Sequence, residues 1–337
     1  MAKKSPGSAL LGAWSRSASA FTRQALRANR ATTARALRLA VARDRAPPGA
    51  GDWIAGIAAS TGGVRRYRLY RPPGVAFGER LPLLVMLHGC DQDAASFATS
   101  TRMNAVAARE RFLVLYPEQD RLANGHGCWN WFDTRSGRAH GEASIVMAAI
   151  DQVCWTAFAD SARVAVAGLS AGASMAALLA MRYPHRFRAV VMHSGVPPGQ
   201  ANSGVDALSA MRGHRPVAAL PAAGAASGLA PLPPLLVIHG AGDRVVTASN
   251  AHAAVRLWAE AAGARAAAPR EMRRGARYPM TVTDYRAGPR TIARLVEIPK
   301  LGHAWSGGAA KHKYADKAGP NASLMAWRFA AGQFAVG

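Results

Sequence analysis

A chain of 337 residues, half of them hydrophobic, can bury one sizeable core or at most two, and no apolar run approaches the roughly 18 residues of a membrane span. The net charge of +23 is carried mostly by arginine and is spread along the chain, without a helix-turn-helix, zinc-finger or RNP-like pattern. A transmembrane protein and a specific nucleic-acid binder are therefore not expected.

The first 51 residues differ in charge from the rest of the chain. Ten Lys and Arg residues stand against one acid, Asp44, in this stretch. Its apolar run, Ala9–Trp14, is short and closely followed by Arg16, which is a poor match to a secretory signal peptide. Because charge-rich termini without a core are usually mobile, we expect residues 1–51 to form a basic, flexible leader. The alternative is a basic helical arm that makes weak contact with an anionic surface.

From residue 52 onwards, short apolar segments alternate with helical patterns. LLVMLH is a continuous apolar run, typical of a strand buried on both faces, and VRRYRLYR alternates as an edge strand does. The expected strands are Val64–Arg71, Leu83–His88, Phe112–Tyr116, Arg163–Ala167, Ala189–His193, Leu235–His239 and Arg294–Ile298. The expected helices are Thr101–Glu110, Glu142–Phe158, Ala171–Tyr183 and Ser249–Ala262, with a long loop at 213–233. This order predicts one α/β domain over residues 52–337, with a mostly parallel central sheet and helices on both faces.

A turn at Ser170 carries the first indication of chemistry. The stretch RVAVAGLSAGASM runs as a strand, stops in Gly-Leu-Ser-Ala-Gly and continues as an Ala-rich helix pattern. In such a G-x-S-x-G turn, Gly168 and Gly172 leave room for a sharply bent backbone that lifts the serine hydroxyl clear of the sheet. The Ala171 amide then lies at a helix N-terminus, which favours negative charge. The pattern predicts Ser170 as a nucleophile and the Ala171 amide as an oxyanion donor.

A serine nucleophile needs a base and a carboxylate that orients the base. Asp243 follows the buried strand of LLVIHGAGDRVV, and His303 follows the strand of LVEIPKLGHAWSGG. Both stand just past a strand end, where open α/β sheets build their sites. The loop of LLVMLHGCDQD is expected to supply the second oxyanion donor, the backbone amide of Cys90. Taken alone, Asp243 fits an ordinary turn acid, but the joint order favours a Ser170, Asp243 and His303 triad.

Three tryptophans near these motifs are candidates for a substrate wall. Trp129 and Trp131, in GHGCWNWF, fit either core aromatics or the wall of an acyl or polymer groove. Trp305, two residues after His303, is the better candidate because its position is tied to that of the expected base. The other strand-end histidines are expected to serve packing and backbone hydrogen bonding: His88, His193 and His239.

The three cysteines, Cys90, Cys128 and Cys154, lack the C-x-x-C spacing of a zinc or redox site. A disulfide between Cys90 and Cys128, both in loops near the expected site, is one reading of the sequence. Three separate small core residues are the other. A serine triad requires no metal or organic cofactor, and none is expected here.

Five segments, LHGCDQD, CWNWF, GLSAGASMA, HGAGDRVV and GHAWSGG, together resemble the polyhydroxybutyrate (PHB) depolymerase-type esterase family of α/β-hydrolases. The resemblance runs in order from about Val64 to the C-terminus. It implies an α/β-hydrolase fold with the triad and the two oxyanion amides named above, and a disulfide between Cys90 and Cys128. One residue departs from the pattern, because Ala173 stands where the family's serine turn usually continues with a second glycine. A methyl group there is expected to fit the first helical turn while narrowing the approach to Ser170.

The resemblance implies a serine carboxylic-ester hydrolase that forms an acyl-enzyme on hydroxyalkanoate oligomers, polyester or similar short acyl esters. Acetyl or feruloyl esters of plant polysaccharide are the alternative substrates. Soluble substrates are favoured, because no linker or polymer-adsorbing domain follows MAWRFAAGQFAVG. A non-catalytic binding protein on the same fold and a serine peptidase are the rival functions. The missing signal peptide favours the cytoplasm, whereas a cysteine pair favours an oxidising, periplasmic or secreted location.

Overall fold

The computed structural model describes residues 46–216 and 230–335. The chain divides into two units, Met1–Ala46 and Pro47–Gly337, and the fold described below is that of the second. Most of the expected leader at 1–51 and of the expected loop at 213–233 lies outside the described residues. The expected domain boundary at residue 52 therefore stays a prediction.

One mixed sheet forms the centre of the described fold, with the strand order β1-β2-β4-β3-β5-β6-β7-β11-β10-β8 and with β9 paired to β10. Its strands are β1 (Asp52–Ser60), β2 (Gly63–Arg71), β3 (Leu81–Leu87), β4 (Leu113–Pro117), β5 (Ala159–Leu169), β6 (Ala189–His193), β7 (Leu235–Gly240), β8 (Arg265–Ala266), β9 (Arg270–Met272), β10 (Met280–Ala287) and β11 (Arg290–Ile298). From β4 to β11 neighbouring strands are parallel. The two ends of the sheet pair antiparallel. A short parallel pair, β12 (Trp305–Ser306) and β13 (Ala315–Asp316), lies outside this sheet.

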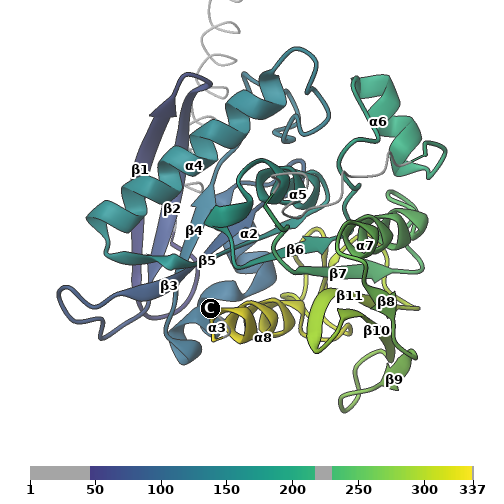
Figure 1. The fold of residues 1–337 in the computed structure, drawn as a ribbon. Helices are drawn as coiled ribbons and strands as arrows, with labels where there is room; N and C mark the ends of the chain where they lie inside the picture. Colours follow the sequence, from purple (N-terminus) through teal and green to yellow (C-terminus); the bar gives the residue numbers. More distant parts are fainter. Residues whose placement is uncertain (1–45, 217–229, 336–337) are drawn as a thin grey trace, which may run out of the picture. The chain divides into compact units, whose positions relative to one another are not determined.

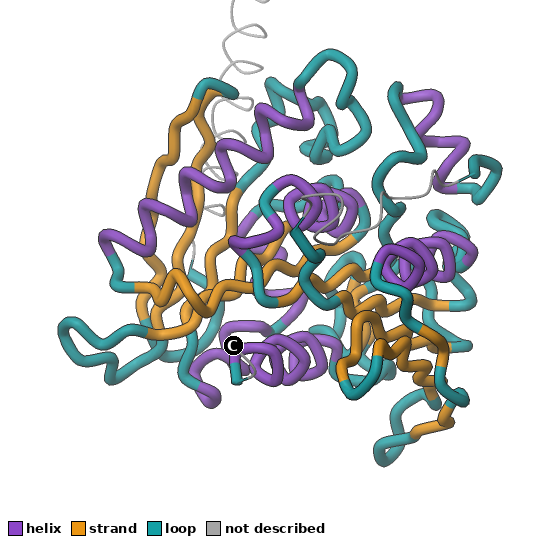
Figure 2. The backbone as a smooth tube through the Cα atoms, in the orientation of Figure 1, coloured by secondary structure: helices purple, strands orange, loops and turns teal. Residues whose placement is uncertain are grey.

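Helices cover both faces of the sheet (Figure 1, Figure 2). They are α2 (Ala94–Thr101), α3 (Met103–Glu110), α4 (Arg138–Thr156), α5 (Ala171–Arg182), α6 (Gly204–Met211), α7 (Ser249–Ala261) and α8 (Ala322–Phe334), with one 3-10 turn at Pro184–Arg186. Helices α4, α5 and α7 lie over one face, and α3 and α8 lie over the other (Figure 1). None of the helices in the described ranges is both long and apolar enough to cross a membrane. The α/β architecture predicted from the sequence is confirmed.

Alternation within single strands explains why the sheet needs two helix layers. In β3, Leu83, Val85 and Leu87 belong to the core under α4 and α5, whereas Leu84 and Met86 belong to the core under α3 and α8. All five side chains are fully buried. A strand that is apolar on both sides is stable only between two covering layers. The cover on both faces of β3 explains why its sequence is a continuous apolar run.

Two expectations about single elements were wrong. The expected edge strand, β2, pairs with β1 on one side and with β4 on the other, so β1 is the edge. The alternation in β2 arises because Tyr67 and Leu69 are buried while Arg66 is exposed. The expected helix over 101–110 begins two residues later, as α3 over Met103–Glu110, because Arg102 adopts a φ of 58° and separates it from α2 by a left-handed turn.

Candidate active site

Ser170 lies on the sharp turn between β5 and α5. Its backbone has a φ of 55° and a ψ of −121°, a conformation that costs about 1–3 kcal/mol for a residue with a side chain. The Ser170 amide donates to the carbonyl of His193 at 2.9 Å, and the Ser174 amide donates to the carbonyl of Ser170 at 3.1 Å. These bonds hold the strained turn in place. Strain that the surrounding structure maintains in this way is concentrated at functional sites.

Two glycines make this turn sterically accessible. A Cβ atom at Gly172 would lie 2.1 Å from the carbonyl oxygen of Leu87, the last residue of β3. A Cβ atom at Gly168 would lie 2.3 Å from the backbone carbonyl carbon of Gly172. Both separations are far shorter than any real carbon contact, so only glycine fits. The turn therefore packs directly against the end of β3, and the loop that carries Cys90 begins there.

Ala173 is the one residue that departs from the family's serine-turn pattern. Its side chain does not obstruct the approach to Ser170. Its side chain is fully buried. Its methyl group packs against Gly195, where an added Cβ would lie 2.6 Å from the Ala173 Cβ. Ala173 is not among the residues that line the cavity at Ser170. The expectation that this methyl group narrows the approach to Ser170 was therefore wrong.

Asp243 and His303 contact each other although they are 60 residues apart in the chain. Oδ2 of Asp243 accepts a hydrogen bond from Nδ1 of His303 at 2.8 Å, and Oδ1 accepts the backbone amides of Val245 and Val246 at 2.9 Å each. Burial raises the pKa of Asp243, but the hydrogen bond and charge of His303, together with the two amides, hold that pKa below its ordinary value. Asp243 is therefore ionised at neutral pH. A carboxylate can only accept, so Nδ1 of His303 carries the proton and Nε2 is left as an acceptor.

Ser170 and His303 line one cavity of about 270 Å³. Other residues that line it include Cys90, Cys128, Leu169, Met211, Val245 and Tyr314. The structure thus brings the three residues of the expected triad to one edge of the parallel sheet, past the C-terminal ends of β5, β7 and β11. Met211 and Tyr314 were missed by sequence reasoning, because neither stands in a motif.

The backbone amides of Cys90 and Ala171 lie beside Ser170 in different ways. On either side of Cys90, the amides of Gly89 and Asp91 are engaged in hydrogen bonds of 3.0 and 2.7 Å. The Cys90 amide itself has no acceptor among the described residues. Ala171 is the first residue of α5, and the first amides of a helix have no intrahelical acceptor. Both amides are therefore available to an anionic oxygen, which suits the role expected for them.

A disulfide joins Cys90 to Cys128, with an S–S distance of 2.04 Å. It ties the loop after β3 to the loop between β4 and α4, at the cavity that both cysteines line. Cys154 is free and half-buried, and burial raises the pKa of its thiol. Within residues 46–216 and 230–335, no group of three or more His, Cys, Asp and Glu side chains is arranged to hold a metal ion.

The three tryptophans that were candidates for a substrate wall are core residues, which for Trp129 and Trp131 is one of the two interpretations that the sequence left open. Trp129 and Trp305 are fully buried, Trp131 is 8% exposed, and none of them lines the cavity. Trp305 donates from Nε1 to Oγ of Ser323 at 3.0 Å, and its ring stacks on that of His193 with centroids 5.0 Å apart. The expectation for Trp305 was wrong because closeness to His303 in sequence does not decide which way a side chain points. At β12 the chain turns Trp305 into the core.

The strand-end histidines are buried and bonded to the backbone, as expected. The Nε2 atoms of His88 and His193 each accept a hydrogen bond from a backbone amide at a distance of 3.1 Å. Nε2 of His239 donates a hydrogen bond to a backbone carbonyl at 2.9 Å. Nε2 of His239 also lies 3.6 Å from Oδ2 of Asp243. Burial lowers the pKa of His239 and brings that of His193 to about 3, so both imidazoles are neutral at neutral pH.

A parallel-centred sheet between two helix layers, with a strained serine after β5 and an Asp–His pair past later strands, defines the α/β-hydrolase class. Within this class, the chain belongs to the esterase PHB depolymerase family, whose model matches residues 65–277.

Individual relatives cover only part of this chain. It is 35% identical over 177 residues to poly(3-hydroxyalkanoate) depolymerase C from Paucimonas lemoignei, covering 50% of this chain and 42% of that protein. It is 33% identical over 116 residues to feruloyl esterase B from Neurospora crassa, covering 34% of this chain and 39% of that protein. The chain thus matches less than half the length of each of these two curated relatives. Among solved structures, an acetyl xylan esterase from Aspergillus awamori superposes with a TM-score of 0.59 at 21% identity, covering 76% of this chain and 94% of that one, which shows the shared fold.

Proposed function

We propose that this protein is a serine carboxylic-ester hydrolase with Ser170, His303 and Asp243 as its catalytic triad. The observation that carries the proposal is the cavity shared by Ser170 and His303, in which the imidazole is already bonded to an ionised carboxylate. That bond leaves Nε2 of His303 as the only ring nitrogen able to take a proton. Membership of the esterase PHB depolymerase family supports the same chemistry.

In the proposed reaction, Oγ of Ser170 bonds to the ester carbonyl carbon while Nε2 of His303 takes the hydroxyl proton. The amides of Cys90 and Ala171 hold the oxyanion that forms, and losing one such donor costs about 2.7–4 kcal/mol. The tetrahedral intermediate then expels the alcohol, which receives the proton from His303, and an acyl-enzyme remains. Water, deprotonated by the same nitrogen, attacks the acyl carbon; the bond to Oγ then breaks, His303 returns the proton to Oγ, and the carboxylic acid and free Ser170 are released.

The proposed substrates are hydroxyalkanoate oligomers and similar short acyl esters. A cavity of about 270 Å³, with Leu169, Met211 and Val245 among its lining residues, suits a short apolar acyl group. The relative named as a poly(3-hydroxyalkanoate) depolymerase supports this choice. Acetyl and feruloyl esters are the second candidate, supported by relatives named as feruloyl esterase and probable acetylxylan esterase. Contact of residues 1–51 with an anionic surface is proposed on their charge alone.

The test is hydrolysis of p-nitrophenyl esters from acetyl to hexanoyl by the wild-type protein and by Ser170→Ala. The variant should lose turnover by a factor of about 10³ or more, because the nucleophile is removed. Ser136→Ala, on an exposed loop, is the matched control and should retain full turnover. Folded wild-type protein that cleaves none of these esters would refute the proposal. Equal rates on the matching anilides would favour a peptidase, and a panel of hydroxybutyrate oligomers, acetyl esters and feruloyl esters ranks the substrates.

A further inference from the structure

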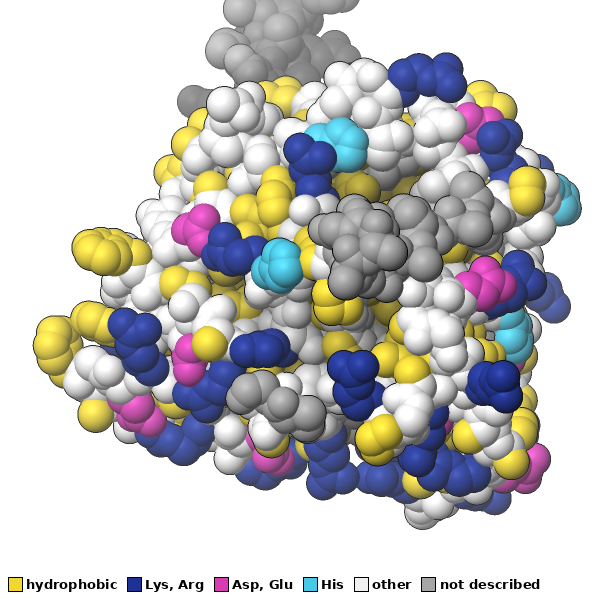
Figure 3. Space-filling view, in the orientation of Figure 1, with side chains coloured by type: hydrophobic (Ala, Val, Ile, Leu, Met, Phe, Trp, Pro, Cys, Tyr) yellow, Lys and Arg dark blue, Asp and Glu magenta, His cyan; other side chains and the backbone are white. Residues whose placement is uncertain are grey.

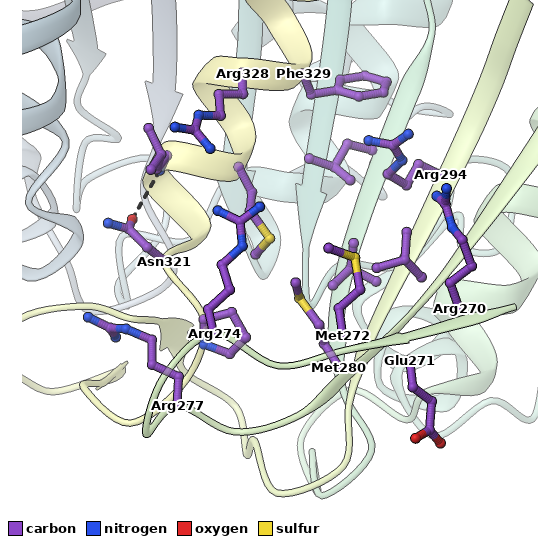
Figure 4. Close-up of a pocket in the computed structure, with 16 residues that line it drawn as sticks. Arg270, Glu271, Met272, Arg274, Arg277, Met280, Arg294, Asn321, Arg328 and Phe329 are labelled. Carbon is purple, nitrogen blue, oxygen red and sulfur yellow. Dashed lines mark hydrogen bonds between the residues drawn. The ribbon is translucent and has the colours of Figure 1, made fainter.

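A second cavity, of about 630 Å³, lies on the α8 side of the sheet (Figure 4). The loop between β9 and β10 forms one wall, and the first half of α8 forms another. This cavity shares no lining residue with the one at Ser170. Lys and Arg side chains gather along this edge of the molecule, at the bottom of the view in Figure 3. The site is therefore separate from the proposed catalytic centre.

The floor of the second cavity is apolar. Leu236 of β7, Met280 and Val282 of β10 and Val296 of β11 reach it from the buried core of the sheet. Met272 of β9 adds a side chain that is 36% exposed. Figure 4 shows Met272 and Met280 directed into the space between the arginine side chains. Methionine side chains adapt readily to an apolar chain laid against them.

The rim carries five arginines and a single acid. The arginines are Arg270, Arg274, Arg277, Arg294 and Arg328. The acid is Glu271, whose carboxylate points away from the arginines in Figure 4. The cavity therefore combines an apolar floor with a strongly positive rim, and such a rim attracts an anion.

Three of these arginines already have partners. Arg270 and Arg294 bind the buried carboxylate of Asp284 at 2.8 and 2.5 Å. Arg277 donates to two backbone carbonyl oxygens at 2.8 and 2.7 Å. Burial raises the pKa of Asp284, but the hydrogen bond and charge of Arg294 and the charges of Arg270 and Arg286 hold it below its ordinary value. One carboxylate charge is thus shared among several guanidinium groups.

Arg274 and Arg328 are different, because neither has a hydrogen-bond or ion-pair partner among the described residues. They come from opposite walls, the β9–β10 loop and α8, and both are exposed. A guanidinium group is a planar fork of donors that matches a carboxylate in two parallel hydrogen bonds. Two unpaired guanidinium groups above an apolar floor therefore suit a ligand with an anionic head and an apolar tail.

We propose that this second cavity binds a linear medium-chain carboxylate, with its head between Arg274 and Arg328 and its alkyl chain on the floor. A small inorganic anion would leave the floor uncovered, and an uncharged alkane would leave the guanidinium groups unpaired. The cavity volume lies within the range of small-molecule sites. Nothing in the proposal depends on the chemistry at Ser170.

Isothermal titration calorimetry of the full chain with dodecanoate, below its critical micelle concentration, tests the proposal. Saturable binding with one site per chain is expected, and it should weaken as salt is added. Dodecyltrimethylammonium has the same chain and the opposite charge, and acetate has the same head without the chain. Both should bind at least about tenfold more weakly, since each lacks one of the two interactions. No binding of dodecanoate, or equally tight binding of the ammonium probe, would overturn the proposal.

Variants then place the binding at this cavity. Arg274→Gln with Arg328→Gln should weaken dodecanoate binding by about tenfold or more, because charge-assisted hydrogen bonds are lost. Arg256→Gln with Arg290→Gln removes the same charge at exposed positions that do not line the cavity, and should leave the affinity unchanged. Unaltered affinity in the first pair, or an equal loss in both pairs, contradicts the assignment. The single variants Arg274→Gln and Arg328→Gln give the same test if the first pair does not fold.

Discussion

Nδ1 of His303 lies 2.8 Å from Oδ2 of Asp243, and the two residues meet because β7 and β11 are parallel neighbours in the sheet. Asp243 stands three residues after the end of β7, and His303 stands five residues after the end of β11. Parallel strands end at the same edge of a sheet, so the loops that leave them lie side by side. Strand order, rather than distance along the chain, therefore creates this contact.

Asp243→Asn should lower kcat for ester hydrolysis by roughly 10³- to 10⁴-fold while leaving the fold intact. The asparagine oxygen can still accept the amides of Val245 and Val246. Its NH₂ group, however, donates toward Nδ1 of His303, so the imidazole proton moves to Nε2 and the base is lost. Steady-state kinetics with a p-nitrophenyl ester measures the effect. Asp160→Asn, which alters an acid paired with Arg163, is the control, and a loss below tenfold in Asp243→Asn would contradict the role.

Gly172→Ala and Gly332→Ala should change stability in opposite directions. The added methyl group at Gly172 meets the Leu87 carbonyl oxygen at 2.1 Å, so the free energy of unfolding should fall by about 3 kcal/mol. Gly332 lies in α8 with open space around it, and alanine there should raise the free energy of unfolding by about 1 kcal/mol. Urea denaturation of both variants measures the difference. An equal change in the free energy of unfolding at the two positions would contradict the close packing of Gly172 against Leu87.

Removing the disulfide should destabilise the protein and weaken catalysis. Cys90 and Cys128 are separated by 38 residues, and opening a loop of this length costs about 4 kcal/mol in the chain-entropy account. The double variant Cys90→Ala with Cys128→Ala should show this loss in denaturant unfolding, with a lower kcat because the Cys90 amide is no longer held. Cys154→Ala, at the free cysteine, should change the unfolding free energy by about 1 kcal/mol or less. A double variant as stable as Cys154→Ala would refute this account.

The free energy of unfolding should fall in mild acid because His193 is buried in its neutral form. Its pKa is lowered from 6.5 to about 3 in the folded protein by burial, the nearby His239 and His303 adding to the effect, whereas the unfolded chain protonates at the ordinary value. Between these two pKa values the unfolded state binds a proton that the folded state does not, so stability falls as pH falls. The slope is about 1.4 kcal/mol per pH unit for this residue.

His193→Gln isolates that contribution, because the glutamine oxygen can accept the amide of Ser306 that His193 accepts. The free energy of unfolding, measured by urea at several pH values between 6.5 and 4, should depend less steeply on pH in the variant. Slopes that coincide for the two proteins would show that His193 is not held neutral by burial.

Local patterns predicted the elements whose geometry depends only on neighbouring residues. The apolar run of β3 requires cover on both faces, and the glycines around Ser170 permit a turn that other residues do not. The edge strand β1 was not predicted because five of its nine residues are exposed and only Ala58 is buried, so its sequence carries no apolar stripe. Its pairing with β2 is what identifies it.

The sequence by itself determined the α/β class, the serine turn, and Asp243 and His303 as candidate partners past strand ends. Only the tertiary structure decided that His303 bonds to Asp243, that Cys90 pairs with Cys128, and that Trp305 turns into the core. It also decided that arginines from β9, the β9–β10 loop, β11 and α8 surround one apolar floor. The physical reason is that turns and strands arise from interactions over a few residues, whereas these contacts depend on strand order and packing between segments far apart in the chain.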